Sequence, residues 1–416
     1  MSGFKRAVFF FSALTLLTRL VFIAHFSHNP ANILDVDGYV GIARSLLSGQ
    51  GYALEPGVLT LERSPGFPLW IAFLFLVFGG NPLVVLLGNA VLNVVTGLLL
   101  AWLALRLFTR RCALIVLAVW SVYPFAVYYG GWNYLETFLL FLFTALLAAI
   151  YKWRESRNCL WAGGCGILAA LAGLVNPAAL PWIGVIPLWF FIREERSRAW
   201  RAFWLYSLLG VAVYAPWPIR NQIAFGKPVL TNIHGGLNLY QALIVSPDDL
   251  GTPQQTRDFD ADSYYQQIML VMQQRRYIEA NEMLLRGSLA RIKARPFAYL
   301  SSCAYRVVKL WRLYPYQRAY PYHYRIIFWI SLLSDGWIIP LALLGLWGAR
   351  RRWRELFPLY SAVVLWTLAY ALIYAVMRYR MPVMPVMILF AAAALDDFLP
   401  WSRSPGARWV SPAGRR

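Results

Sequence analysis

The sequence contains few charged residues for its length. Of its 416 residues only 14% are Asp, Glu, Lys or Arg, whereas about a quarter is usual in soluble domains. Hydrophobic residues make up 59% of the chain, and aromatic residues make up 16%. This composition excludes an ordinary soluble domain and indicates an all-α polytopic membrane protein.

Cysteines and glycine-rich nucleotide motifs are scarce as well. The sequence has no Rossmann glycine fingerprint, no P-loop and no low-complexity tract. It also has no clear internal repeat, which counts against a secondary transporter. Four cysteines without metal or redox spacing are interpreted as packing residues: Cys112, Cys159, Cys165 and Cys303.

Basic residues outnumber acidic residues by 39 to 19, which gives a net charge of +20. They gather in short runs between apolar segments, an arrangement that fixes the orientation of a membrane protein. We therefore expect anionic lipid headgroups, and not nucleic acid, as their partners. Hydropathy predicts about ten transmembrane helices, at residues 7–24, 81–105, 112–128, 134–151, 160–175, 178–192, 202–215, 326–347, 356–376 and 382–399.

Charge decides the place of a further apolar segment, 67–78, which is short for a span. All basic runs fall on one side of the membrane if this segment lies on the outer surface as an amphipathic helix. Both termini are then cytoplasmic, and the first span is retained because no small-residue cleavage site follows it. Three regions are predicted. The first is a transmembrane module at 1–216, which contains a first outer loop at 25–80, and the last comprises C-terminal helices with a cytoplasmic tail at 326–416. Between them lies a small second outer loop region at 217–325 of mixed structure, extended at 226–241 and helical at 263–294.

Two carboxylates, Asp35 and Asp37, precede a short amphipathic segment in the first outer loop. Apolar residues from Tyr39 onward recur at helical spacing, and Gly49 and Gly51 end the pattern. A helix of this length lies along a membrane surface. Asp37 suits the role of helix N-cap, whereas capping does not explain Asp35. A carboxylate at such a boundary can take a proton from a hydroxyl or hold an acceptor.

Two other acids are predicted on the outer side. Glu62 and Arg63 precede the segment 67–78, where an ordinary solvated ion pair is the simpler interpretation. Glu136 begins the fourth span, where an acid in the first turn favours the helix dipole. Its location on the same side as Asp35 leaves a functional role open.

Arg378 and Arg380 lie between the last two spans on the outer side, against the positive-inside trend. Snorkelling toward the interface is the simpler explanation, but arginine is also suited to bidentate phosphate binding. Arg220, just past the seventh span, is another arginine on this side. Asp335, inside the eighth span, is left without a role.

Taken together, four segments resemble the GT-C class of membrane glycosyltransferases that use polyprenyl-phosphate sugars. Its members include dolichyl-phosphate-mannose protein mannosyltransferases and the lipid A aminoarabinose transferase. DVDGYVGIAR resembles the acid followed by Y-x-x-x-A-R of the family and places Asp35 at the catalytic-acid position. Glu62-Arg63 resembles an acid–base pair before a proline-containing surface helix. RMPVMP, which begins at Arg380, resembles a basic residue before P-x-x-P, and WPIRN resembles a W-x-x-R-N run of bacterial members.

The resemblance implies inverting transfer of a sugar from a polyprenyl phosphate to a hydroxyl acceptor at the outer face of the membrane. Asp35 would deprotonate the acceptor, and which of the two aspartates binds the acceptor and which is the base stays open. Arg380 would neutralise the departing phosphate. The implied site residues are Asp35 and Asp37 for catalysis, Arg380, Arg378 and Arg63 for the donor phosphate, and Tyr39, Glu62, Glu136 and Arg220 for the acceptor or sugar pocket.

The implied partners are the lipid-linked donor, membrane lipids and a glycan, lipid or protein acceptor. No cofactor is implied, and two carboxylates alone make a poor site for a divalent ion, so we expect metal-independent activity. The expected location is a bacterial inner membrane, with the site on the periplasmic face. Two alternatives stay open: a transporter or flippase of lipid-linked sugars, and a glycan polymerase or ligase.

Overall fold

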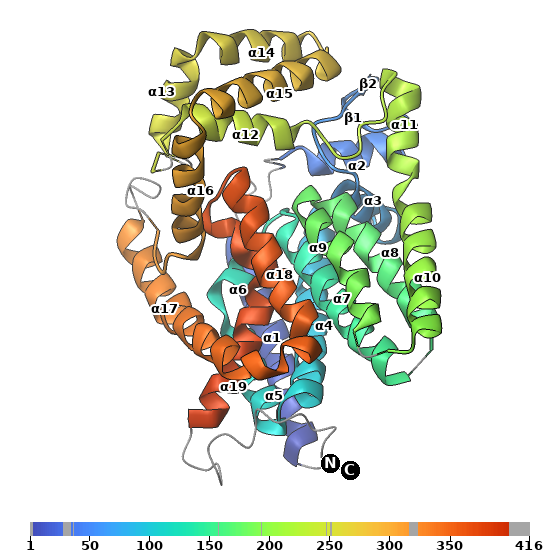
Figure 1. Ribbon diagram of the computed structural model, residues 1–416, viewed down its shortest axis with the longest axis vertical. Helices are drawn as coiled ribbons and strands as arrows, with labels where there is room; N and C mark the ends of the chain where they lie inside the picture. The colour runs from blue at the N-terminus through green and yellow to red at the C-terminus, as the bar shows by residue number, and fades with distance from the viewer. Residues whose placement is uncertain are drawn as a thin grey trace.

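The chain is almost entirely helical (Figure 1). The computed structural model describes residues 3–27, 35, 37–156, 158–192, 194–246, 248–249, 252–315 and 323–398, and the predicted tail at 399–416 lies outside them. Within these residues the one sheet is a two-stranded antiparallel hairpin of β1 (Ala53–Glu55) and β2 (Val58–Leu59). The predicted all-α polytopic architecture is confirmed.

Six helical stretches of the described chain are long and apolar enough to cross a membrane. A seventh forms if α5 (Arg110–Val122) and α6 (Pro124–Gly130), which meet at a bend of 51°, act as one span. The ring of Pro124 cannot continue the helix of α5, and this explains the bend. The six are α1 (Gly3–Ser27), α4 (Leu83–Leu107), α7 (Glu136–Ser156), α10 with α11 (Arg196–Tyr214, Pro216–Phe225), α17 with α18 (Tyr324–Gly348, Trp353–Leu372), and η6 with α19 (Met377–Val383, Met384–Phe398).

The count of ten spans is not confirmed. Two predicted spans are occupied by shorter helices: α8 (Leu160–Val175), and η2 (Pro177–Ala179), α9 (Leu180–Val185) and η3 (Ile186–Phe191) in series. The predicted spans at 326–347 and 356–376 form one helical stretch that is broken at η5 (Ala349–Arg352), where Figure 1 shows the chain turning back from α17 into α18. The short apolar helix expected at 67–78 is α3 (Gly66–Phe78), which packs against α2 (Tyr39–Leu47) and α8.

The part of the second loop region expected to be helical, 263–294, is helical, whereas the part expected to be extended contains no strand among its described residues: residues 226–233 are irregular, and a helix begins at His234. Extended structure was expected at 226–241, where glycine and proline are frequent. There the Asn232 side chain accepts a hydrogen bond from the His234 amide and starts a helix, whose Leu237 and Tyr240 are buried. The helices that follow α11 are α12 (His234–Ile244), α13 (Pro253–Ala261), α14 (Ser263–Gln273), α15 (Tyr277–Ala294) and α16 (Pro296–Trp311).

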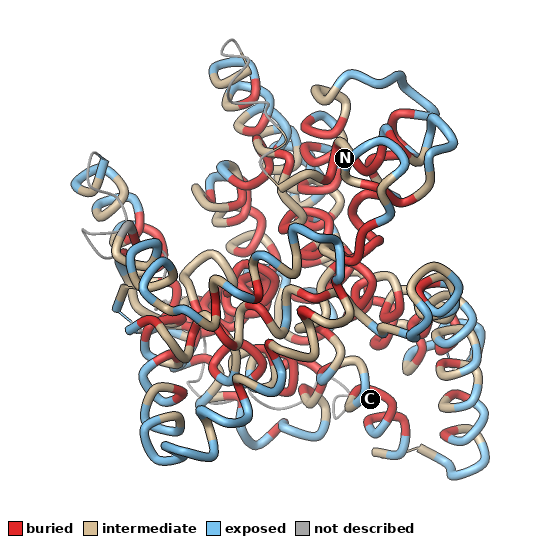
Figure 2. The backbone as a smooth tube through the Cα atoms, turned by 90° about the horizontal axis from the view of Figure 1, so that it is seen from above, coloured by how far each residue is buried: buried red, intermediate tan, exposed pale blue. Residues whose placement is uncertain are grey.

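The two loop regions lie together at the end of the molecule that is remote from the N-terminus (Figure 1). The amide of Ile233 donates to the carbonyl of Leu61 across the two regions, at 3.3 Å. Buried residues gather in the middle of the helices, and exposed residues surround them (Figure 2). The folded loops therefore form a cap over one end of the helix bundle.

Glycines allow two pairs of helices to approach closely. Gly166 of α8 lies against the backbone of Tyr206 in α10, and Gly345 of α17 lies against the backbone of Phe390 in α19. A Cβ atom at either glycine would overlap a carbonyl oxygen of the facing helix. Small residues at such crossings are typical of membrane helix packing.

Replacing Gly166 by Val is expected to lower the free energy of unfolding by about 1–3 kcal/mol, because the facing backbone cannot rotate away. Gly164→Val is the matched control, since it lies on the same helix with no atom within 4 Å of the added Cβ. Thermal unfolding of both variants in detergent measures the difference. Equal losses of stability would contradict the packing argument.

Candidate active site

Helix α2 begins with an unusual cap. Its N-cap residue is Gly38, which has φ of 77° and offers no side chain. Instead Oδ2 of Asp35 accepts a hydrogen bond of 2.6 Å from the amide of Gly41, and its other oxygen is buried without a hydrogen-bond partner. The interpretation of Asp37 as the cap is wrong, because Asp35 satisfies this free amide of the first turn.

The carboxylate of Asp37 lies between two guanidinium groups. Nη2 of Arg63 is 3.4 Å from its Oδ1, and Nη2 of Arg378 is 3.8 Å from its Oδ2. Arg63 also donates from Nε to the carbonyl oxygen of Asp37, at 2.8 Å. These contacts join the first outer loop to η6, which are more than 300 positions apart in the sequence.

Arg378 is held by a second acid. Its Nε pairs with Oε1 of Glu136, the first residue of α7, and its guanidinium lies 4.1 Å above the ring of Tyr134. Glu136 is only 3% exposed, and its Oε2 has no hydrogen-bond partner. Arg378 therefore bridges the acids Glu136 and Asp37.

These groups face a cavity of about 420 Å³, within the range usual for small-molecule sites. The buried ring of Tyr39 lies 5.5 Å from the guanidinium of Arg63, and burial raises the pKa of its phenol. The structure thus brings together five of the predicted site residues around one cavity: Asp37, Tyr39, Arg63, Glu136 and Arg378.

His234, at the start of α12, also lines this cavity and was not predicted as a site residue. Its Nε2 lies 2.9 Å from Nη1 of Arg63 and must accept, because a guanidinium has no acceptor. Burial, and then the charge of Arg63, lower the pKa of His234 to about 3. Neighbouring Asn232 donates to Oγ of Ser64 at 2.7 Å, so this turn of the second loop contacts both Arg63 and Ser64 of the first loop. A lone histidine without a motif gave no signal in the sequence.

This pKa predicts a dependence of stability on pH. The folded-state value lies below the ordinary 6.5, so the neutral imidazole stabilises the fold above pH 6.5, and this contribution is lost as the pH falls toward 3. The unfolding temperature should therefore fall less between pH 7 and pH 4 in His234→Gln, which keeps an acceptor for Arg63, than in the unmodified protein. His25→Gln, at an exposed histidine, is the control. Identical pH profiles of the unmodified protein and His234→Gln would contradict the prediction.

Arg380 does not line this cavity. It is 2% exposed, forms an ion pair with the fully buried Asp335, and donates to the carbonyl oxygens of Leu310 at 3.1 Å and Arg312 at 2.5 Å. Asp335 also accepts a hydrogen bond of 2.8 Å from Tyr123. A small adjoining cavity of about 30 Å³ contacts both Arg380 and Arg378. Asp335, which the sequence left without a role, is thus the partner of Arg380.

Glu62 and Arg220 also lie away from the 420 Å³ cavity. Arg220 donates to the carbonyl oxygens of Thr60 and Tyr52, both at 3.1 Å, and so joins α11 to the residues that flank β1 and β2 in the first loop. Glu62 forms a side-chain hydrogen bond with Tyr277, at the start of α15. Both residues connect the two loop regions.

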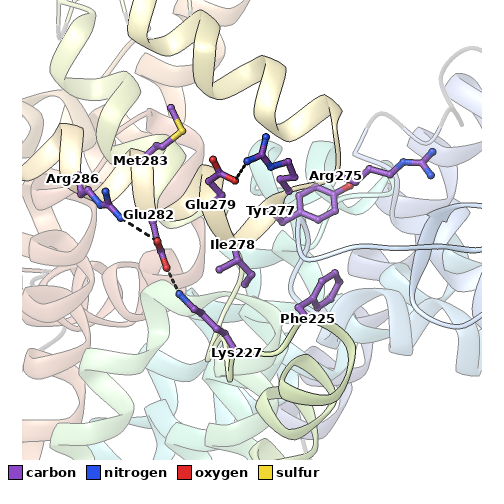
Figure 3. Close-up of a pocket in the computed structure, with 10 residues that line it drawn as sticks. Phe225, Lys227, Arg275, Tyr277, Ile278, Glu279, Glu282, Met283 and Arg286 are labelled. Atoms are coloured by element: carbon purple, nitrogen blue, oxygen red, sulfur yellow. Dashed lines mark hydrogen bonds and ion pairs between the residues drawn. The ribbon is translucent and has the colours of Figure 1, made fainter.

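A larger cavity of about 670 Å³ opens on the second loop region (Figure 3). Its basic residues are engaged in exposed ion pairs: Lys227 and Arg286 with Glu282, Arg276 with Glu279, and Arg275 with Glu55. Exposed pairs of this kind contribute little to stability. None of the predicted site residues lines this cavity, and it offers no group poised for catalysis.

Metal binding receives no support from the part of the chain that the structure describes. It contains no group of three or more His, Cys, Asp and Glu side chains that could hold a metal ion. The cavity offers a carboxylate pair, Asp37 and Glu136, each already facing Arg378. These residues do not fit a divalent-ion site.

The family model of dolichyl-phosphate-mannose-protein mannosyltransferases matches residues 62–219. The resemblance seen in the sequence is confirmed. The matched segment includes Arg63 and Glu136, whereas Asp37 and Arg378 lie outside it. No curated protein matches the chain.

Solved structures share the fold. The archaeal oligosaccharyltransferase AglB from Archaeoglobus fulgidus, in complex with an inhibitory peptide and a dolichol-phosphate, is similar with a TM-score of 0.54 and 14% identity. The match covers 95% of this chain and 51% of AglB, so the chain spans about half the length of that protein. The apo form of the same enzyme gives a TM-score of 0.55 at 15% identity, and covers 95% of this chain and 50% of that one. ArnT from Cupriavidus metallidurans bound to undecaprenyl phosphate gives 0.47 at 14% identity, with 93% and 77% covered.

Proposed function

We propose that the chain is an inverting glycosyltransferase that moves a sugar from a polyprenyl-phosphate donor to a hydroxyl acceptor. The observation that carries this proposal is the Asp37 carboxylate in a 420 Å³ cavity, flanked by the guanidinium groups of Arg63 and Arg378. A base next to two cations is what transfer from a phosphate requires: the base accepts the proton of the attacking hydroxyl, and the cations stabilise the departing phosphate.

The donor phosphate is assigned to Arg378 and Arg63. Arg378 contacts both the main cavity and the small cavity beside it, so it can meet a phosphate that enters between helices. The two related enzymes support this donor class, since AglB was solved with a dolichol-phosphate and ArnT with undecaprenyl phosphate. Arg380, whose guanidinium is engaged by Asp335 and two carbonyl groups, is assigned to holding η6 in place.

Asp37 is assigned as the base in place of Asp35. Its carboxylate lines the cavity, while the carboxylate of Asp35 caps α2. In the proposed step the acceptor oxygen forms a bond to the anomeric carbon and its proton passes to Asp37. The bond from the anomeric carbon to the phosphate oxygen breaks, and the polyprenyl phosphate leaves with the electron pair. Glu136 keeps Arg378 oriented toward the site through their ion pair.

The reaction is assigned to the outer face of a bacterial inner membrane. The support is that the cavity lies among the two loop regions, while the basic runs were predicted on the opposite side. A transporter or flippase is the rival function. It would need ionisable groups along a path through the membrane, and the charged residues of this cavity lie beside residues of the two loop regions instead.

Turnover in vesicles tests the proposal. The purified protein is placed in vesicles of phosphatidylethanolamine and phosphatidylglycerol with a radiolabelled polyprenyl-phosphate hexose and a cell-envelope extract as acceptor source. Transfer of label with release of polyprenyl phosphate supports the proposal. Movement of the intact donor across the bilayer without cleavage would identify a flippase instead. Loss of all transfer upon chelation would contradict metal-independent activity.

A further inference from the structure

Helix α16 carries its charged residues on the inside. Arg306 is completely buried and Lys309 is 5% exposed, although both are basic. The exposed residues of α16, every residue of which the structure describes, include no Asp, Glu, Lys or Arg. Most of them are apolar or aromatic: Phe297, Ala298, Leu300, Ala304, Tyr305 and Val308. A helix that faces water has the opposite arrangement, with its charged side chains on the outer face.

The inward face of α16 supplies hydrogen bonds to the end of α18. This helix ends at Leu372, and the last carbonyl groups of a helix have no partner within it. Arg306 donates from Nη1 to the carbonyl oxygen of Ala371 at 3.2 Å, and Tyr299 donates to that of Leu372 at 2.8 Å. Arg306 also donates from Nη2 to the carbonyl oxygen of Ala242 in α12, at 2.7 Å. The guanidinium group therefore joins α16 both to the bundle and to the cap.

The chain that links α18 to η6 is not helical at residues 373–376. Backbone of this kind occurs at membrane depth only where protein covers it and supplies its hydrogen bonds. Helix α16 packs against both α18 and η6, and Arg380 of η6 donates to the carbonyl oxygens of Leu310 and Arg312 at the end of α16. Helix α16 thus covers the break between α18 and η6.

The outward face of α16 continues the apolar surface of two spanning helices. Figure 1 shows α16 descending from the cap beside α18 and leading toward α17. Leu368 and Leu372 of α18 are about half exposed, and Ile326 and Trp329 in the first turns of α17 are more exposed still. Helices α17 and α18 form one of the stretches that are long and apolar enough to cross a membrane. Hydrocarbon suits a face that adjoins this surface, whereas contact with water is unfavourable for it.

The length of α16 limits how it can lie in a membrane. Its 16 residues extend over about 24 Å at the usual rise of a helix, less than the thickness of the hydrocarbon core. Exposed Lys293 and Arg295 directly precede it. Basic side chains at such a boundary reach the phosphate groups of lipids. These features fit a helix that enters one leaflet without crossing the bilayer.

We infer that α16 is immersed in the leaflet on the side of the cap, with Phe297, Leu300 and Val308 against acyl chains. The predicted outer loop region at 217–325 then lies partly within the membrane. Through Arg306, α16 anchors α12 to the bilayer, and residues of α12 line the 420 Å³ cavity. This anchoring holds whichever reaction the cavity performs.

Spin labels at single introduced cysteines test the inference in the full chain, in vesicles of phosphatidylethanolamine and phosphatidylglycerol. Cys159→Ser is the background, because the other three cysteines are buried and do not react. Leu300→Cys and Val308→Cys place labels on α16. The controls are Leu333→Cys, exposed on the spanning helix α17, and Leu289→Cys, exposed on α15 of the cap.

Collisions of each label with oxygen and with a neutral nickel chelate are then measured. Oxygen dissolves in hydrocarbon and the polar chelate is excluded, so the oxygen-to-nickel ratio should be about 10-fold higher at both α16 positions than at Leu289. It should equal the ratio at Leu333. Variants are compared only if their thermal unfolding matches the background protein, and Phe297→Cys replaces an α16 variant that does not fold.

Two results would overturn the inference. Ratios on α16 that equal the ratio at Leu289 mean that this face lies in water. Few collisions with either reagent at Leu300 and Val308 mean that another protein surface, such as a second copy of the chain, covers the face in place of lipid.

Discussion

Asp37→Asn is expected to lower turnover by about 10²- to 10⁴-fold, the range that a positioned general base contributes. The amide keeps the shape of the side chain but cannot accept the proton of the attacking hydroxyl. It also leaves Arg63 and Arg378 facing a neutral group instead of a carboxylate. Affinity for the donor phosphate should therefore stay the same or rise, while kcat falls.

Asp35→Asn is the matched control for this experiment. Its side-chain oxygen can still accept the hydrogen bond from the Gly41 amide, so α2 should form and turnover should change by less than about 10-fold. Single-turnover transfer from a labelled donor, with donor binding measured separately, distinguishes chemistry from binding. If Asp35→Asn loses turnover and Asp37→Asn retains it, the base is Asp35, as the family resemblance first implied.

The sequence predicted the helices better than their arrangement. Long apolar runs separated by bases identify membrane segments because the bilayer imposes a length and a composition. The strings at 160–175 and 178–192 form helices shorter than a typical span, and they are also buried inside the protein: α8 packs against α10, and Trp182 and Trp189 of the following helices lie in the core. Hydropathy alone cannot distinguish a core helix from a spanning one.

The orientation of the aspartates could not be predicted from the sequence. The spacing of Asp35 and Asp37 before a helix is compatible with either one as the cap. The deciding feature is Gly38, whose left-handed backbone turns the chain so that Asp35 reaches the amide of Gly41. Asp37 is then left facing Arg63 and Arg378.

The ion pair between Arg380 and Asp335 could not be predicted from the sequence either. Arg380 and Asp335 are 45 positions apart, and neither residue alone indicates the other. An arginine on an outer loop suggested a phosphate ligand, since exposure was assumed from its position. Burial is set by α16, α17 and η6 packing around it, a tertiary property that local sequence does not contain.

Asp335→Ala is expected to destabilise the protein by about 3–5 kcal/mol, because it leaves the buried charge of Arg380 without a partner. The pair is almost completely buried, and Asp335 also accepts a hydrogen bond from Tyr123. Adding Arg380→Met to Asp335→Ala should recover part of the loss, since it removes the unpaired charge. Glu282→Ala, which breaks the exposed pair with Lys227, is the control and should cost less than about 1 kcal/mol.

Donor binding by the double variant then decides what Arg380 does. If Arg380 only holds η6 in place, the folded Asp335→Ala/Arg380→Met protein should keep its affinity for a polyprenyl-phosphate hexose within about 10-fold, since Arg378 and Arg63 remain. Arg378→Gln, in contrast, should weaken that affinity by more than this. A stable double variant that no longer binds the donor would show that Arg380 binds the donor phosphate. In that case Asp335 would act as a counter-ion that releases Arg380 when the phosphate arrives, because a guanidinium group held by one acid can exchange it for another anion.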